Sequence, residues 1–248
     1  MSRNISKAGY ATAHWIRFPE IVTPETIARA EAPAESLSWK IGPDGPVGPS
    51  GVHLPSNIWC GVALFTDLAA ANAALDAKER HLPWLPNAVE SWHALLLPIA
   101  HRGECNHIER AAPGPIFDIA ARDPGGPLLV MTTAGFNQGA DLDLARVIDF
   151  RVHLGGVHEW LKSVDGRIAS QVFTPHTAGD DSVTMSIWRN DAVMVGSMYK
   201  PGAHRAQIDR YQTEKTADRT SFTRFRVLRT AGQWNGVDLM RAAIAGGG

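Results

Sequence analysis

The sequence predicts an α+β fold of two lobes, each with the βαββαβ order of a ferredoxin-like unit. Three observations predict it. The same order of strand and helix segments occurs twice in the 248 residues, one short pattern recurs at the same place in both halves, and a segment rich in Gly and Pro separates the halves. A chain of this length buries enough apolar surface to fold without disulfides.

The first half contains four strand segments and two helix segments. Thr23 and Pro24 predict a helix start, because Thr caps a helix and Pro suits its first position. Thr66 and Asp67 predict a second start before an alanine-rich stretch. In chain order we expect a strand at 11–18, a helix at 23–34, strands at 36–41 and 57–65, a helix at 66–78 and a strand at 91–99.

Residues 42–56 hold four prolines and four glycines, which predict a long irregular loop. Loops of this length on a compact domain are often lids or binding loops. We therefore expect residues 42–56 to lie over or beside the mouth of a pocket.

The second half repeats the order of the first. Leu142, Ala145, Ile148 and Val152 recur at helical spacing, and Pro201-Gly202 interrupts a later helix. In chain order we expect a strand at 127–135, a helix at 141–161, strands at 167–174 and 182–188, a helix from 190 that resumes at 204–213, and a strand at 221–228.

The recurring pattern is an aromatic residue at a strand end, a helix cap, and alanine. It occurs as Phe65-Thr66-Asp67-Leu68-Ala69 and as Trp188-Arg189-Asn190-Asp191-Ala192. The resulting domain boundaries are a first lobe at 1–99, a linker at 100–126, a second lobe at 127–229 and a tail at 230–248.

A βαββαβ unit places both helices on one face of its sheet and leaves the other face uncovered. Two such sheets packed face to face cover one another. Curved sheets that meet in this way often leave room for one flat ligand, so we expect a pocket between them.

Composition excludes several classes of protein. The two cysteines, Cys60 and Cys105, form no CxxC motif and suggest a reducing compartment, so we expect a cytoplasmic protein. No apolar run approaches the ~18 residues of a membrane span, and a net charge of −1 gives no basic stripe for nucleic acid. GxSxG, GxxxxGK[ST] and HExxH motifs do not occur in the sequence.

Several short motifs resemble one known family. They are Gly126-Pro127-Leu128-Leu129-Val130-Met131-Thr132, Met185-Ser186-Ile187-Trp188 with Asp191-Ala192, Gly202-Ala203-His204, Phe225-Arg226-Val227-Leu228, and, in the first half, Trp39-Lys40 and Ser91-Trp92-His93. In these motifs the chain resembles the spheroidene monooxygenase family, carotenoid ketolase-like proteins of phototrophic bacteria and their relatives. The chain departs from that family at residues 211–218, where relatives usually carry tryptophan.

The resemblance implies a dimeric α/β-barrel-like fold and a bound haem whose iron is used in oxygen chemistry. Chlorite dismutases, dye-decolourising peroxidases and aldoxime dehydratases are other haem enzymes on similar barrels. Fold analogy therefore points to haem without selecting one reaction.

His204 is the candidate axial ligand of the iron. It follows the Pro201-Gly202 break, and Ile208 and Tyr211 recur on its side of the helix, which we expect to face the sheet. An imidazole can bind iron through one nitrogen while the other is hydrogen-bonded. A helix cap or surface role for His204 is the alternative.

Strand alternation predicts further contacts to haem. Gln171 and Phe173 are expected to face the pocket, as are Arg224 and Arg226, whose guanidinium groups could pair with propionates. Solvated arginines at a sheet edge are the alternative. Of His14 and Trp15, which alternate, one is expected to face the pocket.

The other histidines are expected to have no joint role. His153 and His158 lie five apart on one helix, which argues against a shared metal and favours two solvent-facing side chains. Four more are expected in loops, namely His81, His101, His107 and His176.

The sequence thus predicts a haem-dependent, monooxygenase-like oxidoreductase that acts on a small, largely apolar substrate. A haem-dependent dehydratase or an enzyme of N–O or N–N bond chemistry is a second reading, and a non-catalytic haem carrier or small-ligand sensor is a third. We expect no nucleic-acid partner and no membrane span, and a homo-oligomer is compatible with this reading.

Overall fold

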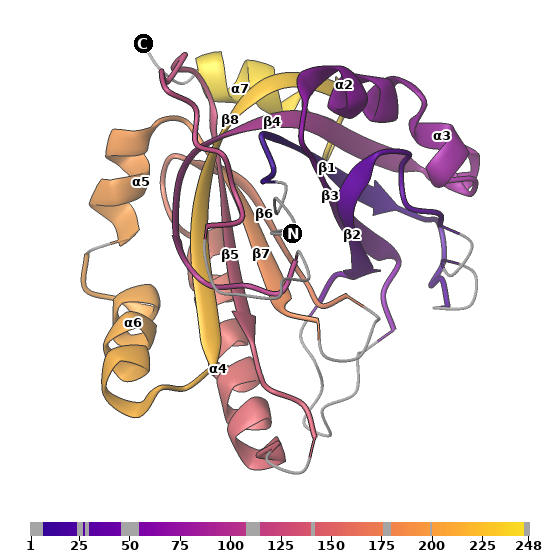
Figure 1. Cartoon of the computed structure of the whole chain (residues 1–248). Helices are drawn as coiled ribbons and strands as arrows, with labels where there is room; N and C mark the ends of the chain where they lie inside the picture. Colours follow the sequence, from indigo (N-terminus) through magenta and orange to yellow (C-terminus); the bar gives the residue numbers. More distant parts are fainter. Residues whose placement is uncertain are drawn as a thin grey trace, which may run out of the picture.

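The computed structural model describes residues 7–23, 27, 30–45, 55–107, 115–139, 142–175, 180–198 and 200–245 (Figure 1). Residues 24–26, 28 and 29 of the expected helix at 23–34 and the centre of the loop at 42–56 fall outside these residues. The described residues 30–34 are not helical, so the expected extension of that helix to residue 34 is wrong. The placement of that loop beside a pocket therefore stays a prediction.

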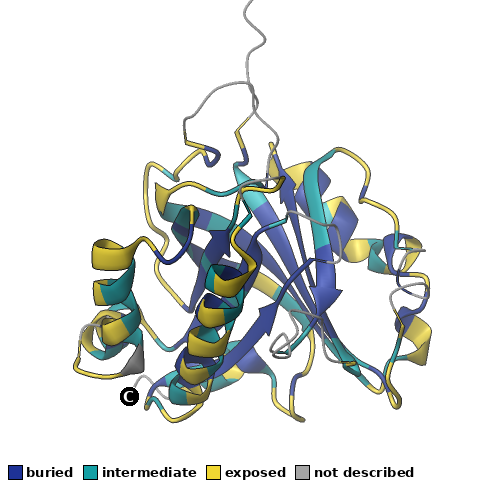
Figure 2. Ribbon diagram, turned by 90° about the horizontal axis from the view of Figure 1, so that it is seen from below, coloured by how far each residue is buried: buried dark blue, intermediate teal, exposed yellow. Residues whose placement is uncertain are grey.

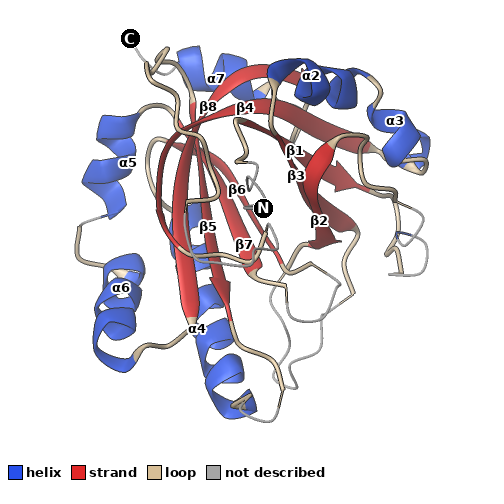
Figure 3. Ribbon diagram, in the orientation of Figure 1, coloured by secondary structure: helices blue, strands red, loops and turns tan. Residues whose placement is uncertain are grey.

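Eight strands form one antiparallel sheet, with helices on its outer face (Figure 3). The first lobe contains β1 (Tyr10–Arg17), β2 (Ser36–Pro43), β3 (Ile58–Phe65), α2 (Leu68–Asp76), α3 (Lys78–His81), the 3₁₀ turn η1 (Leu85–Asn87) and β4 (Glu90–Gly103). The second contains β5 (Leu128–Gly135), α4 (Leu144–Lys162), β6 (Arg167–Phe173), β7 (Ser182–Trp188), α5 (Asp191–Met198), α6 (Ala203–Glu214) and β8 (Arg219–Gly232).

The strand order is β2-β3-β1-β4-β8-β5-β7-β6. The first four strands and the last four have the same order about the β4–β8 pair, at which the lobes join edge to edge. This confirms the prediction of two βαββαβ lobes. Because β4 and β8 are antiparallel, a pseudo-twofold axis relates the lobes.

Strand register and helix caps confirm that the two halves correspond. Tyr10 pairs with Phe65 in the first lobe as Leu128 pairs with Trp188 in the second. Asp67 caps α2 by accepting a hydrogen bond from the N–H of Ala70, three residues on, at 2.9 Å. Asn190 accepts at the same distance from the N–H of Val193 at the start of α5.

The sheet curls until its two edge strands meet. Asp44, directly after β2, forms a bridge with Phe173 of β6, and the N–H of Gly45 donates to the carbonyl of Val172 at 3.0 Å. Gly42 makes the approach feasible, since a Cβ there would lie 2.0 Å from the carbonyl oxygen of Thr174. The result is a barrel whose seam lies between β2 and β6.

Large side chains fill the interior of this barrel. Trp15, Trp92, Phe173 and Phe225 are buried there in one cluster. Figure 2 shows the strands mostly buried, whereas the helices expose their outer faces. The expected flat pocket between the two sheets is therefore wrong for this chain, because its own aromatic residues occupy that space.

The strands extend beyond the predicted lobe boundaries. β4 continues to Gly103, within the expected linker, and β8 continues to Gly232. The expected tail holds α7 (Leu239–Ala245), whose Leu239 is buried in the barrel core with Trp234. This segment is part of the fold.

Candidate functional site

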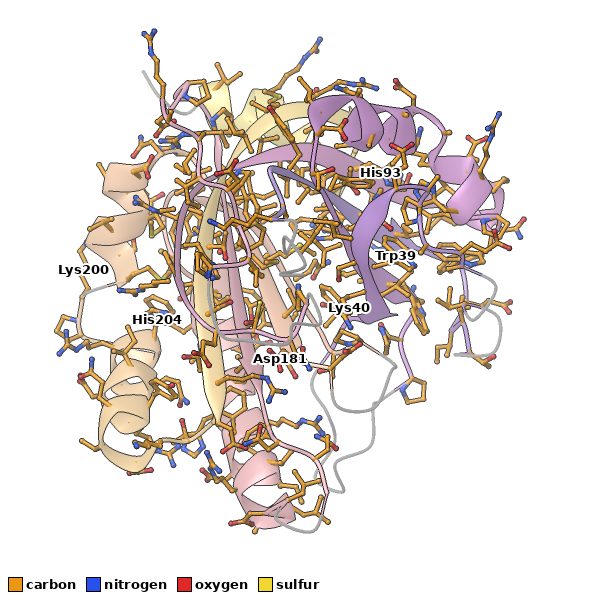
Figure 4. The ribbon with its side chains drawn as sticks, in the orientation of Figure 1. Trp39, Lys40, His93, Asp181, Lys200 and His204 are labelled. Carbon is orange, nitrogen blue, oxygen red and sulfur yellow. The ribbon has the colours of Figure 1, made fainter. Side chains whose placement is uncertain are left out.

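The outer face of the second lobe carries the candidate axial ligand. α5 and α6 follow β7 and are separated by residues 199–202, so the helix break predicted at Pro201-Gly202 is confirmed. Gly202 lies against Trp160 of α4, because a Cβ at this glycine would lie 3.1 Å from the indole nitrogen. His204 follows in the first turn of α6, and Figure 4 shows it between α6 and β8.

The imidazole of His204 is held in one tautomer. Its Nδ1 lies 3.1 Å from the carbonyl oxygen of Met198, the last residue of α5. A carbonyl only accepts, so Nδ1 carries the proton and Nε2 keeps a free electron pair. Burial lowers the pKa of His204, and nearby Arg102 lowers it further, while the bond to Met198 acts in the opposite direction. The ring is therefore neutral at pH 7.

The surroundings of His204 are mostly apolar. Its ring stacks on the indole of Trp160, with centroids 5.8 Å apart and planes inclined by 15°. Met194 and Met198 of α5 are buried in a cluster that Trp160 and Phe222 join. Arg102 of β4 packs over the ring of Phe222 at 4.9 Å. A cation thus stands beside an apolar surface that contains a neutral imidazole.

Arg224 and Arg226 lie on the same outer face of β8 but already form ion pairs. Arg226 is buried, and its guanidinium contacts Asp123 at 2.6 Å and Asp191 at 2.5 Å. Arg224 contacts Asp191 at 3.0 Å. Asp191 begins α5, so these pairs fasten that helix to the sheet.

Gln171 and Phe173 lie on the opposite face of the sheet from His204. Phe173 belongs to the interior cluster, and Gln171, two residues earlier on β6, shares its face. Alternate residues of β5 show the same division, because Leu128 and Val130 join the outer cluster while Leu129 and Met131 join the interior one. The structure therefore places His204 on the same side of the sheet as Arg224 and Arg226, and Gln171 and Phe173 on the other side.

Ile208 is half-buried on α6, one turn after His204, as the helical spacing predicts. Sequence reasoning missed Trp160 and Met198, which contact His204 from α4 and α5. Trp160 lies in the helix predicted at 141–161, yet no sequence signal indicates that this helix packs against α6.

Other histidine expectations have mixed outcomes. His153 is exposed, but His158 is buried, so the expectation that it faces solvent is wrong. His81 and His101 lie in α3 and β4 and not in loops. His107 is buried after β4, and His176 falls outside the described residues. Within the described part of the chain, no group of three or more His, Cys, Asp or Glu side chains is arranged to hold a metal ion.

No family model matches the sequence, and no curated protein matches it significantly. Among solved structures, the chain is similar to an aldoxime dehydratase (OxdRE) in complex with butyraldoxime. The two are 9% identical, with 90% of this chain and 80% of the other covered and a TM-score of 0.56. A second aldoxime dehydratase is 11% identical, with 92% and 83% covered and a TM-score of 0.53.

The chain has the dimeric α/β-barrel fold. Both lobes, their edge-to-edge joint at β4 and β8, and the closing seam belong to that architecture. At these identities the likeness concerns the fold alone. Among the residues described, no helix is both long and apolar enough to cross a membrane.

Proposed function

We propose that this protein is a haem-dependent, monooxygenase-like oxidoreductase in which His204 is the axial ligand of the iron. The hydrogen bond from His204 Nδ1 to the Met198 carbonyl is the observation that carries the proposal. An axial histidine needs a neutral ring with one nitrogen held by a backbone or carboxylate acceptor and the other free. The resemblance to the spheroidene monooxygenase family and the barrel fold support the same cofactor.

The side chains of the outer face would suit haem in two respects: His204 would bind the iron, and apolar side chains would contact one side of the macrocycle. Met194, Met198 and Phe222 would supply apolar contact to the macrocycle, as would Ile208 from α6. Arg102 is exposed beside Phe222 and suits a propionate. Arg224 already pairs with Asp191, so a propionate would have to share its guanidinium with that carboxylate. Arg226 pairs with two carboxylates, and its role would be to hold α5 against the sheet.

When bound, haem supplies an iron centre at which oxygen, peroxide or a nitrogen–oxygen group can react. The chain's own contribution is to fix the His204 ring, to exclude water with Trp160 and the two methionines, and to keep Nε2 unprotonated at neutral pH. A small, largely apolar substrate suits these surroundings.

The test is haem titration of the purified apoprotein, followed by the Soret band, for wild type, His204→Ala and the control His153→Ala. His153 lies on exposed α4 surface, so its removal should leave haem affinity unchanged. His204→Ala should lose the wild-type Soret position and bind haem more weakly, and added imidazole should restore part of the spectrum. An unchanged Soret band and affinity in His204→Ala would overturn the assignment.

Dehydration of an aldoxime is the second candidate, because the two solved structures described above, with TM-scores of 0.56 and 0.53, are aldoxime dehydratases. Dehydration of butyraldoxime to the nitrile releases water with no net oxidation, whereas a monooxygenase consumes oxygen and reductant. Measuring oxygen uptake and nitrile formation side by side separates the two. If the haem protein shows neither, the reading of a carrier or small-ligand sensor is favoured over both enzymes.

A further inference from the structure

The first lobe has a second group of histidines on its outer face. His14 of β1 lies between Gly61 of β3 and His93 of β4 in the strand register. His81 of α3 covers this row, with its ring centroid 5.8 Å from that of His14. Trp39 of β2 completes the group, 5.7 Å from His14 and 5.9 Å from His81; Figure 4 labels Trp39 and His93.

His14 and His93 are completely buried and form a hydrogen-bonded chain that starts at Thr12. The Nδ1 atoms of the two histidines lie 2.9 Å apart, and His14 Nε2 lies 2.9 Å from Thr12 Oγ1. Burial lowers the pKa of His93 to about 3 and that of His14 well below its usual value, so both rings are neutral at pH 7. A neutral ring has one donor and one acceptor nitrogen, so the hydrogen bonds from Thr12 through His14 to His93 can all run in one direction or all in the opposite direction.

The Thr12 hydroxyl selects one direction. If Thr12 donates to His14 Nε2, then His14 Nδ1 donates to His93 Nδ1, and the chain ends in an N–H at His93 Nε2. In the reverse direction, the hydroxyl proton of buried Thr12 would have no acceptor among the described residues. An unmade buried hydrogen bond costs about 1–3 kcal/mol. The first direction is therefore favoured, and His93 presents a donor.

That donor has no partner, and it is not alone. His93 Nε2, His81 Nε2 and Trp39 Nε1 are all buried without a hydrogen bond in the described structure. Lys78, at the start of α3, lowers the pKa of His14, His81 and His93, which places a positive charge near all three. His93 Nε2–H and the indole N–H of Trp39 are thus buried donors beside a cation, and such donors call for an acceptor that carries negative charge. His81 adds a third donor in the tautomer that carries its proton on Nε2.

A metal ion does not fit this group. The Nδ1 atoms of His14 and His93 are hydrogen-bonded to one another, and Lys78 repels a cation. The described histidines also form no cluster arranged to hold an ion.

The pseudo-twofold axis gives the group a counterpart. α2 and α3 are separated at Ala77 as α5 and α6 are separated at residues 199–202, and His81 and His204 both lie in the second member of the pair. We propose that the first lobe has its own binding site beneath α3, in which the Nε2–H of His93 donates to a small carboxylate that His81 and Trp39 also contact. This site does not depend on haem or on the proposed function.

The test uses the full-length apoprotein with acetate and benzoate as probes. Wild type should show a rise in melting temperature with either probe and saturable heat of binding by calorimetry. His93→Phe removes both nitrogens and keeps a flat ring, so its Kd should weaken by about tenfold or more, the loss of one charge-assisted hydrogen bond. His153→Ala, on the exposed surface of α4 in the other lobe, is the matched control and should bind both probes as wild type does.

Two further variants guard against a folding defect in His93→Phe. His81→Phe leaves the Thr12–His14–His93 chain intact and should weaken binding. Thr12→Val is close in shape and removes the hydroxyl that orients the chain, so it should also weaken binding. Spectra of ¹⁵N-histidine-labelled wild type should show His93 protonated at Nε2, with that signal shifted by acetate.

Three results would overturn the proposal. The first is a His93 ring protonated at Nδ1 and bare at Nε2. The second is equal probe affinity in wild type, His93→Phe and His81→Phe. The third is an ordered water on His93 Nε2 in a crystal structure that saturating acetate does not displace.

Discussion

Asp44 accepts a hydrogen bond at Oδ1 from the backbone N–H of Val172, with 2.9 Å between the two atoms. The bond joins the end of β2 in the first lobe to β6 in the second, at the seam of the barrel. Burial raises the pKa of Asp44 to about 6, although the bond from Val172 acts in the opposite direction. A carboxyl group thus helps to close the barrel, and its burial disfavours the charged form.

Asp44→Asn should make the seam insensitive to pH. Because the folded pKa of about 6 exceeds the unfolded value of 3.8, the stability that Asp44 contributes is fully present below pH 3.8 and is lost as the pH rises through 6. Asn keeps an acceptor for Val172 without a charge. We expect the variant to match wild type near pH 4 and to exceed it by on the order of 2 kcal/mol at pH 7.5.

Urea unfolding at several pH values between 4 and 7.5 measures this difference. Exposed Glu20→Gln changes the net charge equally and is the control. A difference between Asp44→Asn and wild type that does not vary with pH would contradict the prediction.

Gly42→Ala should open the seam. The added Cβ would lie 2.0 Å from the carbonyl oxygen of Thr174, which is backbone and cannot turn away. We expect a loss of about 2–3 kcal/mol in the free energy of unfolding. Gly156→Ala is the matched control, since it lies in α4 with open space around it and should gain about 0.5–1 kcal/mol. Equal effects of the two substitutions would show that the close approach at Gly42 is unimportant.

Much of the fold could be predicted from the sequence because it depends on local signals. The caps Asp67 and Asn190, the break at Pro201-Gly202 and strand alternation are all readable within a few residues. The closure of the barrel depends on Asp44 and Val172, 128 positions apart, and no local pattern pairs them. The choice between His14 and Trp15 stayed open, because alternation separates two faces without saying which one the barrel encloses; the structure places Trp15 inside.

The site was predicted in part for the same reason. His204 follows from helical spacing and the break, and its neutral tautomer follows only from the contact with Met198. Arg226 was expected to be free for a ligand. Its ion pairs with Asp123 and Asp191 depend on long-range contacts of the segment before β5 and of α5 with β8, which composition does not reveal.

Arg226→Leu should loosen the attachment of α5 to β8. The substitution leaves Asp191 with Arg224 alone and removes the partner of Asp123, whose pKa the Arg226 side chain holds at about 2. Because both carboxylates are partly exposed, we expect a moderate loss of about 1–3 kcal/mol in urea unfolding. Arg241→Leu, on an exposed helix surface, should change stability by less than about 0.5 kcal/mol. A loss no larger than that of the control would show that the ion pairs do not hold the helix.

Trp160 lies against His204, and we regard it as a positioning residue for that histidine. The indole covers one face of the imidazole, and burial is the main cause of the lowered pKa of His204. Trp160→Leu should expose the ring to water, so the pKa of His204 in the apoprotein should rise toward the ordinary histidine value. Trp160→Phe keeps a flat ring over the imidazole, so the pKa of His204 in this variant should stay close to its wild-type value. Titration followed by histidine ring NMR measures the pKa without haem, and haem titration of the same variants should show weaker binding in Trp160→Leu than in Trp160→Phe. A purely structural role would lower the melting temperature of both variants in proportion to lost volume and leave the pKa of His204 where it is in wild type.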